Sequence, residues 1–419
     1  MMNTQRPLRS ASCILLALIV TLALVPGASA QSTFKTLHKF TLTDPAGTQP
    51  NSLIFDQAGN LYGTTVSSVF KLTPNADGSW SESVLYSFTN CSIGCDVTAG
   101  VTFGAAGILY GTTARGGANS SGTVFSLTPN LDGSWTESVL YSFGATAVDG
   151  IYPYAGLIID QAGNLFGTTG EGGASGGGGT VFELSPNTNG TWKESVLHSF
   201  DYFTFPEANL VMDSAGNLYS TTTWGGDGCC GVVFKLSPNS DGTWTEQILY
   251  SFLGGSDGGN PFGSLIFDQA GNLYGMTLSG GINLSSCDSG CGVAFQLSPN
   301  LDGTWQENVL HSFCSVSGCR DGGDGLATPG TFTNGALVFD QGGNLYGTTW
   351  AGGAYGWGVV FKLGLASNSK WKGRVLHAFM NDPGSKPFDG LIFDGAGNLY
   401  GTTVGDGRSS YGSVFELTP

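Results

Sequence analysis

Short apolar runs separated by glycine-rich turns recur along the chain in a fixed order. A fully apolar run such as residues 265–267 is followed by a D-Q-A-G-N turn and then by a segment resembling N-L-Y-G-T-T. After a glycine-rich loop come a second apolar run, a second turn and a final segment such as residues 247–252. Runs of this length indicate strands, and glycine and asparagine accept the left-handed backbone angles that tight turns need. Each unit is therefore predicted to form four short β-strands.

The G-N-L-Y-G-T-T phrase occurs seven times, with some substitutions, and repetition is the dominant feature of the sequence. The copies begin at Gly59, Gly107, Gly163, Gly216, Gly271, Gly343 and Gly397, between 48 and 72 residues apart. Four short strands in about 50 residues are typical of a β-propeller blade. We therefore expect an all-β protein, a seven-bladed β-propeller with four antiparallel strands in each blade.

The two ends of the repeated region indicate how the ring closes. Residues 36–40 resemble the fourth strand of a repeat and precede any first strand, whereas residues 414–417 resemble a third strand. Each strand type reaches seven copies only if the N-terminal strand completes the last blade. Such pairing hides an otherwise open sheet edge. We expect residues 31–419 to form a single propeller domain closed in this way.

The repeated motifs also resemble a known family. The combination of GNLYGTTxxGG, G-x-V-F-x-L-[ST]-P and V-L-x-S-F, over residues 36–419, is similar to the GloVer tandem repeats of secreted bacterial proteins. The resemblance implies an exported repeat protein without an established activity. Family members called "choice-of-anchor" carry a C-terminal sorting segment. Because the sequence ends on a third-type strand at Pro419, we expect no anchor of that kind. The D-x-x-G-N-L-Y turn is also similar to turns of NHL-type and lactonase-like propellers.

Residues 1–30 have the features of a secretory signal peptide. Arg6 and Arg9 precede an apolar run at residues 13–25, and Ala28-Ser29-Ala30 forms a cleavage site. The run is shorter than the about 20 residues that span a bilayer, although a retained anchor helix is the alternative. We expect cleavage near Ala30 and no membrane insertion, with the mature protein secreted, periplasmic or on the cell surface.

Composition and charge narrow the range of partners. The chain has 419 residues, of which 68 are glycine and only 11% are charged, and its formal net charge is −16. It contains no block of lysine or arginine, so we expect neither nucleic acid nor an anionic membrane as a partner. An extracellular polymer or a surface ligand is the expected partner, and the protein is expected to be a monomer.

Eight cysteines follow the predicted cleavage site, and an even number in an exported protein indicates disulfides. They are Cys91, Cys95, Cys229, Cys230, Cys287, Cys291, Cys314 and Cys319. Their spacings match no common zinc pattern and no histidine is adjacent, so we expect neither a metal site nor a cofactor. The acidic loops at residues 256–260 and 321–325 are the candidates for Ca²⁺, because they carry several oxygen ligands.

The expected pairing is local, because closing a short loop costs the least entropy. Cys91 and Cys95 lie at least two blades from the other cysteines and can pair only with each other. The same reasoning favours the pairs formed by two further short spacings, namely Cys287–Cys291 and Cys314–Cys319. Cys229 and Cys230 then form a vicinal disulfide or stay as two thiols. The alternative is a crosslink from one of these two to Cys287 or Cys291.

The strand order assigns every loop to one face of the ring. The a–b and c–d turns lie on one face, whereas the variable b–c and d–a loops, with all eight cysteines, lie on the other. Variable loops on a rigid scaffold are where binding usually resides, so we take the b–c/d–a loop face as the functional face. The alternative is that long loops simply collect there.

Tryptophans fall into two groups by position. Six follow the c–d turn and are expected to pack between neighbouring blades: Trp80, Trp135, Trp192, Trp244, Trp305 and Trp371. Trp224, Trp350 and Trp357 lie instead in b–c loops, where an exposed indole can stack on a sugar ring. Loop packing is the alternative for these three. Arg115 and Glu171 occupy the same variable loop position as Trp224 and are further candidate ligand contacts.

No catalytic constellation is evident. The four histidines, His38, His198, His311 and His377, share one strand position in different blades, where they alternate with tyrosine. They are too far apart for a common metal or triad, so we assign them structural roles and assign no catalytic residue. We interpret the chain as a secreted binding or scaffold protein that recognises carbohydrate or another extracellular polymer. The alternatives are a polysaccharide hydrolase or lyase that uses loop carboxylates, and a structural surface protein.

Overall fold

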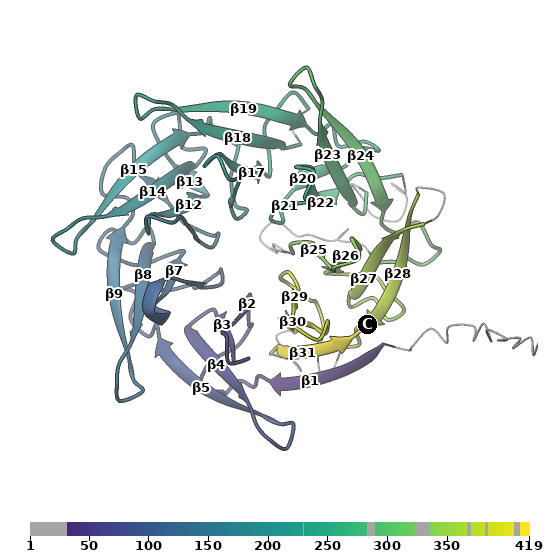
Figure 1. The fold of residues 1–419 in the computed structure, drawn as a ribbon, viewed down its shortest axis with the longest axis horizontal. Helices are drawn as coiled ribbons and strands as arrows, with labels where there is room; N and C mark the ends of the chain where they lie inside the picture. Colours follow the sequence, from purple (N-terminus) through teal and green to yellow (C-terminus); the bar gives the residue numbers. More distant parts are fainter. Residues whose placement is uncertain are drawn as a thin grey trace, which may run out of the picture. The chain divides into compact units, whose positions relative to one another are not determined.

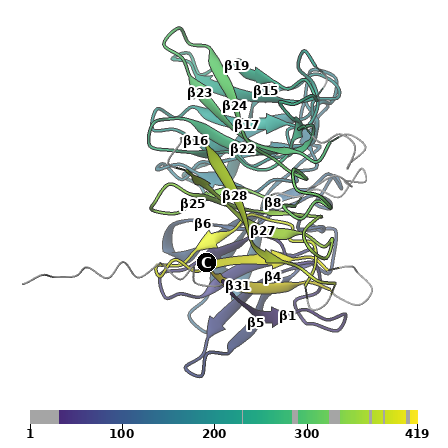
Figure 2. The same cartoon turned by 90° about the vertical axis from the view of Figure 1, so that its right-hand side faces the viewer.

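Each sequence repeat folds into four antiparallel strands, and the resulting sheets are arranged as blades around a centre (Figure 1). Figure 2 shows the ring from the side. The computed structural model describes residues 32–228, 230–282, 290–322, 335–366, 370–381, 384–405 and 411–419. Over these ranges the regular structure is β apart from one 3-10 turn, η1 (Ala105–Gly107). No helix within them is long and apolar enough to cross a bilayer.

The strands of blades one to three are, from the centre outward, as follows. Blade one consists of β2 (Leu53–Phe55), β3 (Leu61–Thr65), β4 (Ser68–Pro74) and β5 (Trp80–Ser87). Blade two consists of β6 (Thr102–Phe103), β7 (Leu109–Thr113), β8 (Thr123–Pro129) and β9 (Trp135–Ser142). Blade three consists of β11 (Ile158–Ile159), β12 (Leu165–Thr169), β14 (Thr180–Pro186) and β15 (Trp192–Ser199).

Blades four to seven follow the same order. Blade four consists of β16 (Val211–Met212), β17 (Leu218–Thr222), β18 (Val232–Pro238) and β19 (Trp244–Ser251). Blade five consists of β21 (Ile266–Phe267), β22 (Leu273–Ser279), β23 (Val293–Pro299) and β24 (Trp305–Ser312). Blade six consists of β25 (Val338–Phe339), β26 (Leu345–Thr349), β27 (Val359–Leu365) and β28 (Trp371–Ala378). Blade seven consists of β29 (Ile392–Phe393), β30 (Leu399–Thr403), β31 (Ser413–Thr418) and β1 (Thr33–Lys39). Three short strands lie in loops: β10 (Gly150–Ile151), β13 (Glu171–Gly172) and β20 (Gly259–Pro261).

The N-terminal strand closes the ring. Strand β1 pairs antiparallel with β31, from Thr33 opposite Thr418 to Lys39 opposite Ser413. The predicted seven-bladed, all-β propeller with four antiparallel strands per blade is thereby confirmed. The closing strand spans Thr33–Lys39, so it begins earlier than the residues 36–40 expected from the sequence. Phe34 extends it, since its ring stacks on His377 with centroids 3.9 Å apart.

In six of the seven blades, an aspartate follows the first strand and holds the a–b turn together; Gly104 stands at this position in blade two. In blade one, Asp56 Oδ1 accepts the backbone N–H groups of Ala58 and Asn60, and Asp56 Oδ2 accepts the Asn60 amide and the Tyr62 hydroxyl. Burial alone would raise the pKa of Asp56, but these hydrogen bonds hold it below its usual value. Gly59 takes the left-handed position of the turn, with φ 82°.

Two repeat residues explain the packing between and within blades. The glycine of each L-Y-G-T-T strand lies beneath the phenylalanine of the next strand: a Cβ on Gly63 would come within 2.6 Å of the Phe70 ring. In blades one, two, three and six, the first threonine of this strand donates a hydrogen bond to a carbonyl of the d–a loop that leads into the following blade, as from Thr64 to Ala99 at 2.9 Å and from Thr112 to Ala155 at 2.9 Å. These contacts hold the end of the d–a loop where it enters the following blade.

The repeat tryptophans lie between blades, as their position predicts. Trp135 of blade two packs edge-on against Tyr62 of blade one, with ring centroids 6.4 Å apart. Trp80 makes the same contact with Tyr400 of blade seven at 6.3 Å. These rings are only half-buried, so they cover the outer part of each interface.

We expect the Trp135→Ala substitution to lower the free energy of unfolding by about 3 kcal/mol. This is the low end of the range for a large aromatic residue, because the Trp135 ring keeps some exposure. Thermal or denaturant unfolding measures it, with Trp224→Ala as the control for loss of an exposed indole. Equal destabilisation by the two substitutions would contradict an interblade role for Trp135.

A row of glutamates that the sequence analysis did not single out lies at the outer strands, one at each of five interfaces. They are Glu82, Glu137, Glu194, Glu246 and Glu307, in the W-x-E segments of the fourth strands. Burial raises the pKa of each, and it does so to about 7 for Glu82, Glu194 and Glu307. A nearby aspartate adds to the effect at these last three. Each glutamate faces the tyrosine or histidine of the preceding blade.

These glutamates predict a stability that rises as the pH is lowered from 8 to about 5.5. A carboxyl whose folded pKa is raised contributes its full stabilisation below the unfolded value and loses it as the pH rises through about 7. Burial lowers the pKa of His377 to about 4, so this residue makes the stability fall as the pH is lowered. Because His377 is a single group, we expect the glutamates to determine the sign of the slope. Thermal unfolding across this pH range measures the slope. Glu194→Gln should flatten it and raise the melting temperature at pH 8, and an unchanged slope would contradict the interpretation.

Candidate functional site

Side chains capable of ligand contact gather over blades two to four on the b–c/d–a loop face. Tyr154 comes from the loop between β9 and β11, and Glu171 lies on β13 in the b–c loop of blade three. Glu207 comes from the loop between β15 and β16. The pairing of β10 with β13, which sets Ile151 opposite Glu171, joins the first two loops.

Tyr154, Glu171 and Glu207 interact with one another. A Cβ on Gly170 would lie 2.8 Å from the Tyr154 ring and 3.5 Å from Glu207 Oε1. Gly170 therefore lies close to both of these side chains. Glu207 Oε2 accepts a hydrogen bond from the Thr223 hydroxyl at 3.3 Å. Burial raises the pKa of Glu207 to about 7, the Thr223 hydrogen bond opposes this rise, and the Glu171 charge adds to it. Burial and both glutamates raise the pKa of Tyr154.

Arg115 lies at the blade-two side of this group. Its Nε is 3.5 Å from Asp96 Oδ2, and its side chain is 65% exposed. The backbone of Arg115 exchanges two hydrogen bonds with that of Cys95, which is disulfide-bonded to Cys91. The small disulfide loop thus positions the strand segment that presents the guanidinium.

An exposed group of aromatic rings lies at the blade-four side, and we call it the aromatic shelf. It consists of the exposed Tyr202, Phe203 and Trp224 and the half-buried Phe205. Tyr202 is 64%, Phe203 59% and Trp224 47% exposed. The Tyr202 and Phe203 ring centroids are 4.0 Å apart. The backbone N–H of Trp224 donates to Thr204 at 3.1 Å, which fixes the b–c loop beside the d–a loop.

Two residues of the aromatic shelf have unusual backbone angles. Phe203 and Phe205 have φ of 66° and 52°, in the left-handed region that bulky residues rarely adopt. Such conformations cost of order 1–3 kcal/mol each and are concentrated at functional sites. The sequence analysis found Trp224 but missed Tyr202 and Phe203. The available signal was the run D-Y-F-T-F, which places three aromatic residues outside any repeat position.

Trp350 and Trp357 lie together in a different sector, between blades six and seven. The Lys386 ammonium lies 4.9 Å from the Trp350 ring centroid and 5.6 Å from that of Trp357. Trp350 also contacts Phe388, with centroids 6.0 Å apart. Trp357 packs against the buried cluster that contains Phe415. Both indoles are half-buried, so the three loop tryptophans do not form one surface.

The cysteines brace loops of the same face. Cys91–Cys95 and Cys314–Cys319 form disulfides, and Cys291 is also disulfide-bonded. Cys230 is half-buried. The remaining predicted pairing partners, Cys229 and Cys287, lie outside the described residues, as does the predicted signal peptide at residues 1–30.

The aspartates of the two acidic loops are engaged by protein groups. Asp257 Oδ2 accepts hydrogen bonds from the Leu253 backbone at 2.8 Å and the Tyr250 hydroxyl at 3.3 Å. Asp321 accepts from the backbone and hydroxyl of Ser315 and lies 3.3 Å from His311. Residues 323–325 of the second loop lie outside the described ranges. These hydrogen bonds hold the two aspartates in place and fix the conformation of the loops that carry them.

Two cavities lie away from the aromatic shelf. One of about 180 Å³ is lined by His311, Asp321 and Arg374 at the interface of blades five and six. Another of about 470 Å³ lies over the a–b turns of blades four and five, beside Asp213 and Trp305. Neither includes a residue of the aromatic shelf, which is an open surface.

The comparisons with known proteins concern family and fold. The Gloeobacter/Verrucomicrobia repeat matches residues 66–287, more than half of the chain. A search of curated protein sequences found no significant match. Virginiamycin B lyase from Staphylococcus aureus has a similar structure, with a TM-score of 0.55 and 15% identity, covering 93% of this chain and 100% of that one.

Two further solved structures have comparable similarity. A streptogramin B lyase has a TM-score of 0.54 and 13% identity, and the match covers 92% of this chain and 97% of the lyase. The extracellular domain of a putative hybrid two component system from B. thetaiotaomicron has a TM-score of 0.52 and 13% identity, with coverage of 92% and 41%. At these identities the likeness shows a common fold alone.

Proposed function

The chain belongs to the Gloeobacter/Verrucomicrobia repeat family, and we propose that this propeller is a secreted protein that binds a carbohydrate polymer on its b–c/d–a loop face. The observation that carries the proposal is the aromatic shelf, with three large side chains about half or more exposed. Single exposed apolar residues need no explanation, but a contiguous exposed group marks an interaction site. Aromatic rings of this kind stack on the apolar faces of sugars.

The polar groups beside the aromatic shelf supply the hydrogen bonds that a sugar needs. Glu171 and Arg115 are exposed, and Glu207 is joined to the aromatic shelf through Thr223. Thr223 in turn donates its backbone N–H to Phe205 at 3.1 Å. Rings and charged groups therefore lie on adjoining segments, an arrangement that suits a ligand with both apolar faces and hydroxyl groups.

An open surface favours a long ligand over a small enclosed one. Tyr202 and Phe203 face solvent, and small-molecule sites are usually concave. The disulfides and the predicted signal peptide support export, where such polymers occur. At 15% and 13% identity, the two lyases of similar fold support the fold alone, so no activity is transferred from them.

One observation favours a second candidate function, cleavage of the bound polymer. Glu207, with a pKa of about 7, lies beside the exposed Glu171. A buried carboxyl group whose pKa is raised to near neutral, beside an exposed carboxyl group, is suited to general acid–base chemistry. If the protein cleaves its ligand, Glu207→Gln should abolish turnover, whereas the stacking contacts of Trp224 and Tyr202 should still hold the ligand.

We expect Trp224→Ala and Tyr202→Ala to weaken polysaccharide binding at least tenfold each, because each removes a stacking ring. Pull-down with insoluble polysaccharides, followed by titration of the best one, measures the effect. Tyr355→Ala is the matched control, since Tyr355 is 58% exposed on a b–c loop of blade six. Melting curves should show all three variants folded. Binding that survives both shelf substitutions, or no binding to any glycan on a broad array, would contradict the proposal.

A further inference from the structure

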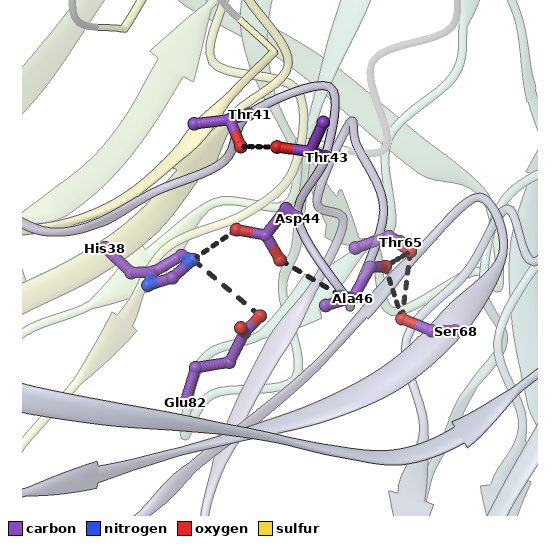
Figure 3. A network of polar contacts seen from close by, with 8 residues as sticks. All are labelled: His38, Thr41, Thr43, Asp44, Ala46, Thr65, Ser68 and Glu82. Atoms are coloured by element: carbon purple, nitrogen blue, oxygen red, sulfur yellow. Dashed lines mark hydrogen bonds and ion pairs between the residues drawn. The ribbon is translucent and has the colours of Figure 1, made fainter.

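Three metal-ligating side chains from three segments meet where the N-terminal strand lies against blade one. His38 lies on β1, Asp44 on the loop that leads from β1 to β2, and Glu82 on β5. Figure 3 shows the His38 ring directed toward both carboxylates. The cluster is at the outer part of the interface between blades seven and one, away from the aromatic shelf.

The donor atoms are close together and shielded from solvent. His38 Nε2 lies 3.1 Å from Asp44 Oδ2 and 3.7 Å from Glu82 Oε1. All three donor atoms lie within 4.8 Å of one another. The side chains of His38, Asp44 and Glu82 are 18%, 8% and 13% exposed. These separations are near the about 3.0–3.5 Å between neighbouring ligand atoms around an ion with 2.0–2.2 Å bonds.

One donor in this cluster lacks a protein partner. Glu82 Oε1 is buried and accepts no hydrogen bond, and at 3.7 Å the imidazole is too distant to supply one. Asp44 Oδ1 already accepts the Ala46 N–H at 3.0 Å, which orients the carboxylate and leaves Oδ2 facing the cluster. A buried carboxylate oxygen without a partner is unfavourable, and a cation placed there would remove that cost. The corresponding oxygens of Glu137, Glu194 and Glu307 are also buried without a partner, so the histidine and the second carboxylate are what distinguish the Glu82 position.

The equivalent positions at other interfaces serve as comparisons. Tyrosine replaces the histidine at the interface with Glu194, where Tyr141 donates to Asp149 at 2.9 Å. His198 lies 3.7 Å from Glu246, and no third donor among the described residues completes a group there. Gly373 stands where the glutamate would face His311. Within the described ranges, the only other gathering of three such donors consists of disulfide-bonded cysteines.

We propose that His38, Asp44 and Glu82 bind one divalent transition-metal ion, with Zn²⁺ as the best match and Co²⁺ or Mn²⁺ as substitutes. An imidazole with two carboxylates suits these ions, whereas Ca²⁺ and Mg²⁺ prefer oxygen ligands alone. The ion would neutralise two converging carboxylates. It would also fix β1, the strand that closes the ring, against blade one. The proposal is independent of carbohydrate binding.

Titration of the EDTA-stripped protein with Co²⁺ tests the site. We expect one equivalent to bind with the visible absorption of a low-symmetry Co²⁺ site, and Zn²⁺ to displace it. Because binding occurs only in the folded state, Zn²⁺ should raise the melting temperature in proportion to the logarithm of its concentration. His38→Gln should weaken binding at least tenfold and abolish the Co²⁺ spectrum.

His198→Gln is the matched control, since it removes the histidine of the corresponding position in blade three and should leave the metal affinity unchanged. Glu82→Gln provides a second variant that preserves shape and should also lose binding. Two results would overturn the proposal: no stoichiometric binding to the wild-type protein, or equal affinity in wild type and the folded His38→Gln variant. In either case the cluster is a proton-sharing contact between blades.

Discussion

Each blade of this propeller buries its apolar surface against its neighbours. The cluster that contains Leu61 and Phe70 of blade one also contains Tyr400 and Val414 of blade seven, although these segments are more than 300 residues apart. A terminal blade of an open array would expose half of such a cluster to water. The chain therefore depends on ring closure, and the pairing of β1 with β31 provides it. The stability of every interface is linked to those few backbone hydrogen bonds.

A closed ring of repeated blades also determines where variation is tolerated. Residues such as Gly63 and Thr64 each make a contact that would be lost with almost any other side chain. The loops that follow these positions carry no such constraint on the b–c/d–a face. They differ in length, charge and disulfide content, while the threonine contacts of blades one, two, three and six hold the end of the following d–a loop in place. Tyr202 and Phe203 can therefore occupy exposed and strained conformations without disturbing the sheets beneath them.

The sequence predicts the fold well because its information is repeated seven times. The turn glycine occurs in all seven copies, and the strand glycine and the interblade tryptophan each occur in six, so a departure in one copy does not obscure the pattern. Residues that break the repeat were found for the same reason, including Arg115, Glu171 and Trp224. Tyr202 and Glu207 were missed because d–a loops differ too much in length to be compared by position. Trp350 and Trp357 were grouped with Trp224 because sequence position does not tell which blade packs over an indole.

The glutamates of the outer strands show a different limit. In the segment W-x-E, glutamate lies on the same strand face as the tryptophan, between exposed polar residues, and the local pattern does not indicate what covers that face. The glutamate is buried because the preceding blade covers it, which is an effect of long-range packing. The same position then supports different chemistry around the ring. A tyrosine donates to an aspartate at one interface, as Tyr141 does to Asp149, whereas His38 meets two carboxylates at another. Equivalent positions in a repeat protein thus share a backbone geometry and differ in the polar groups that surround them, because those groups come from loops that the repeat does not constrain.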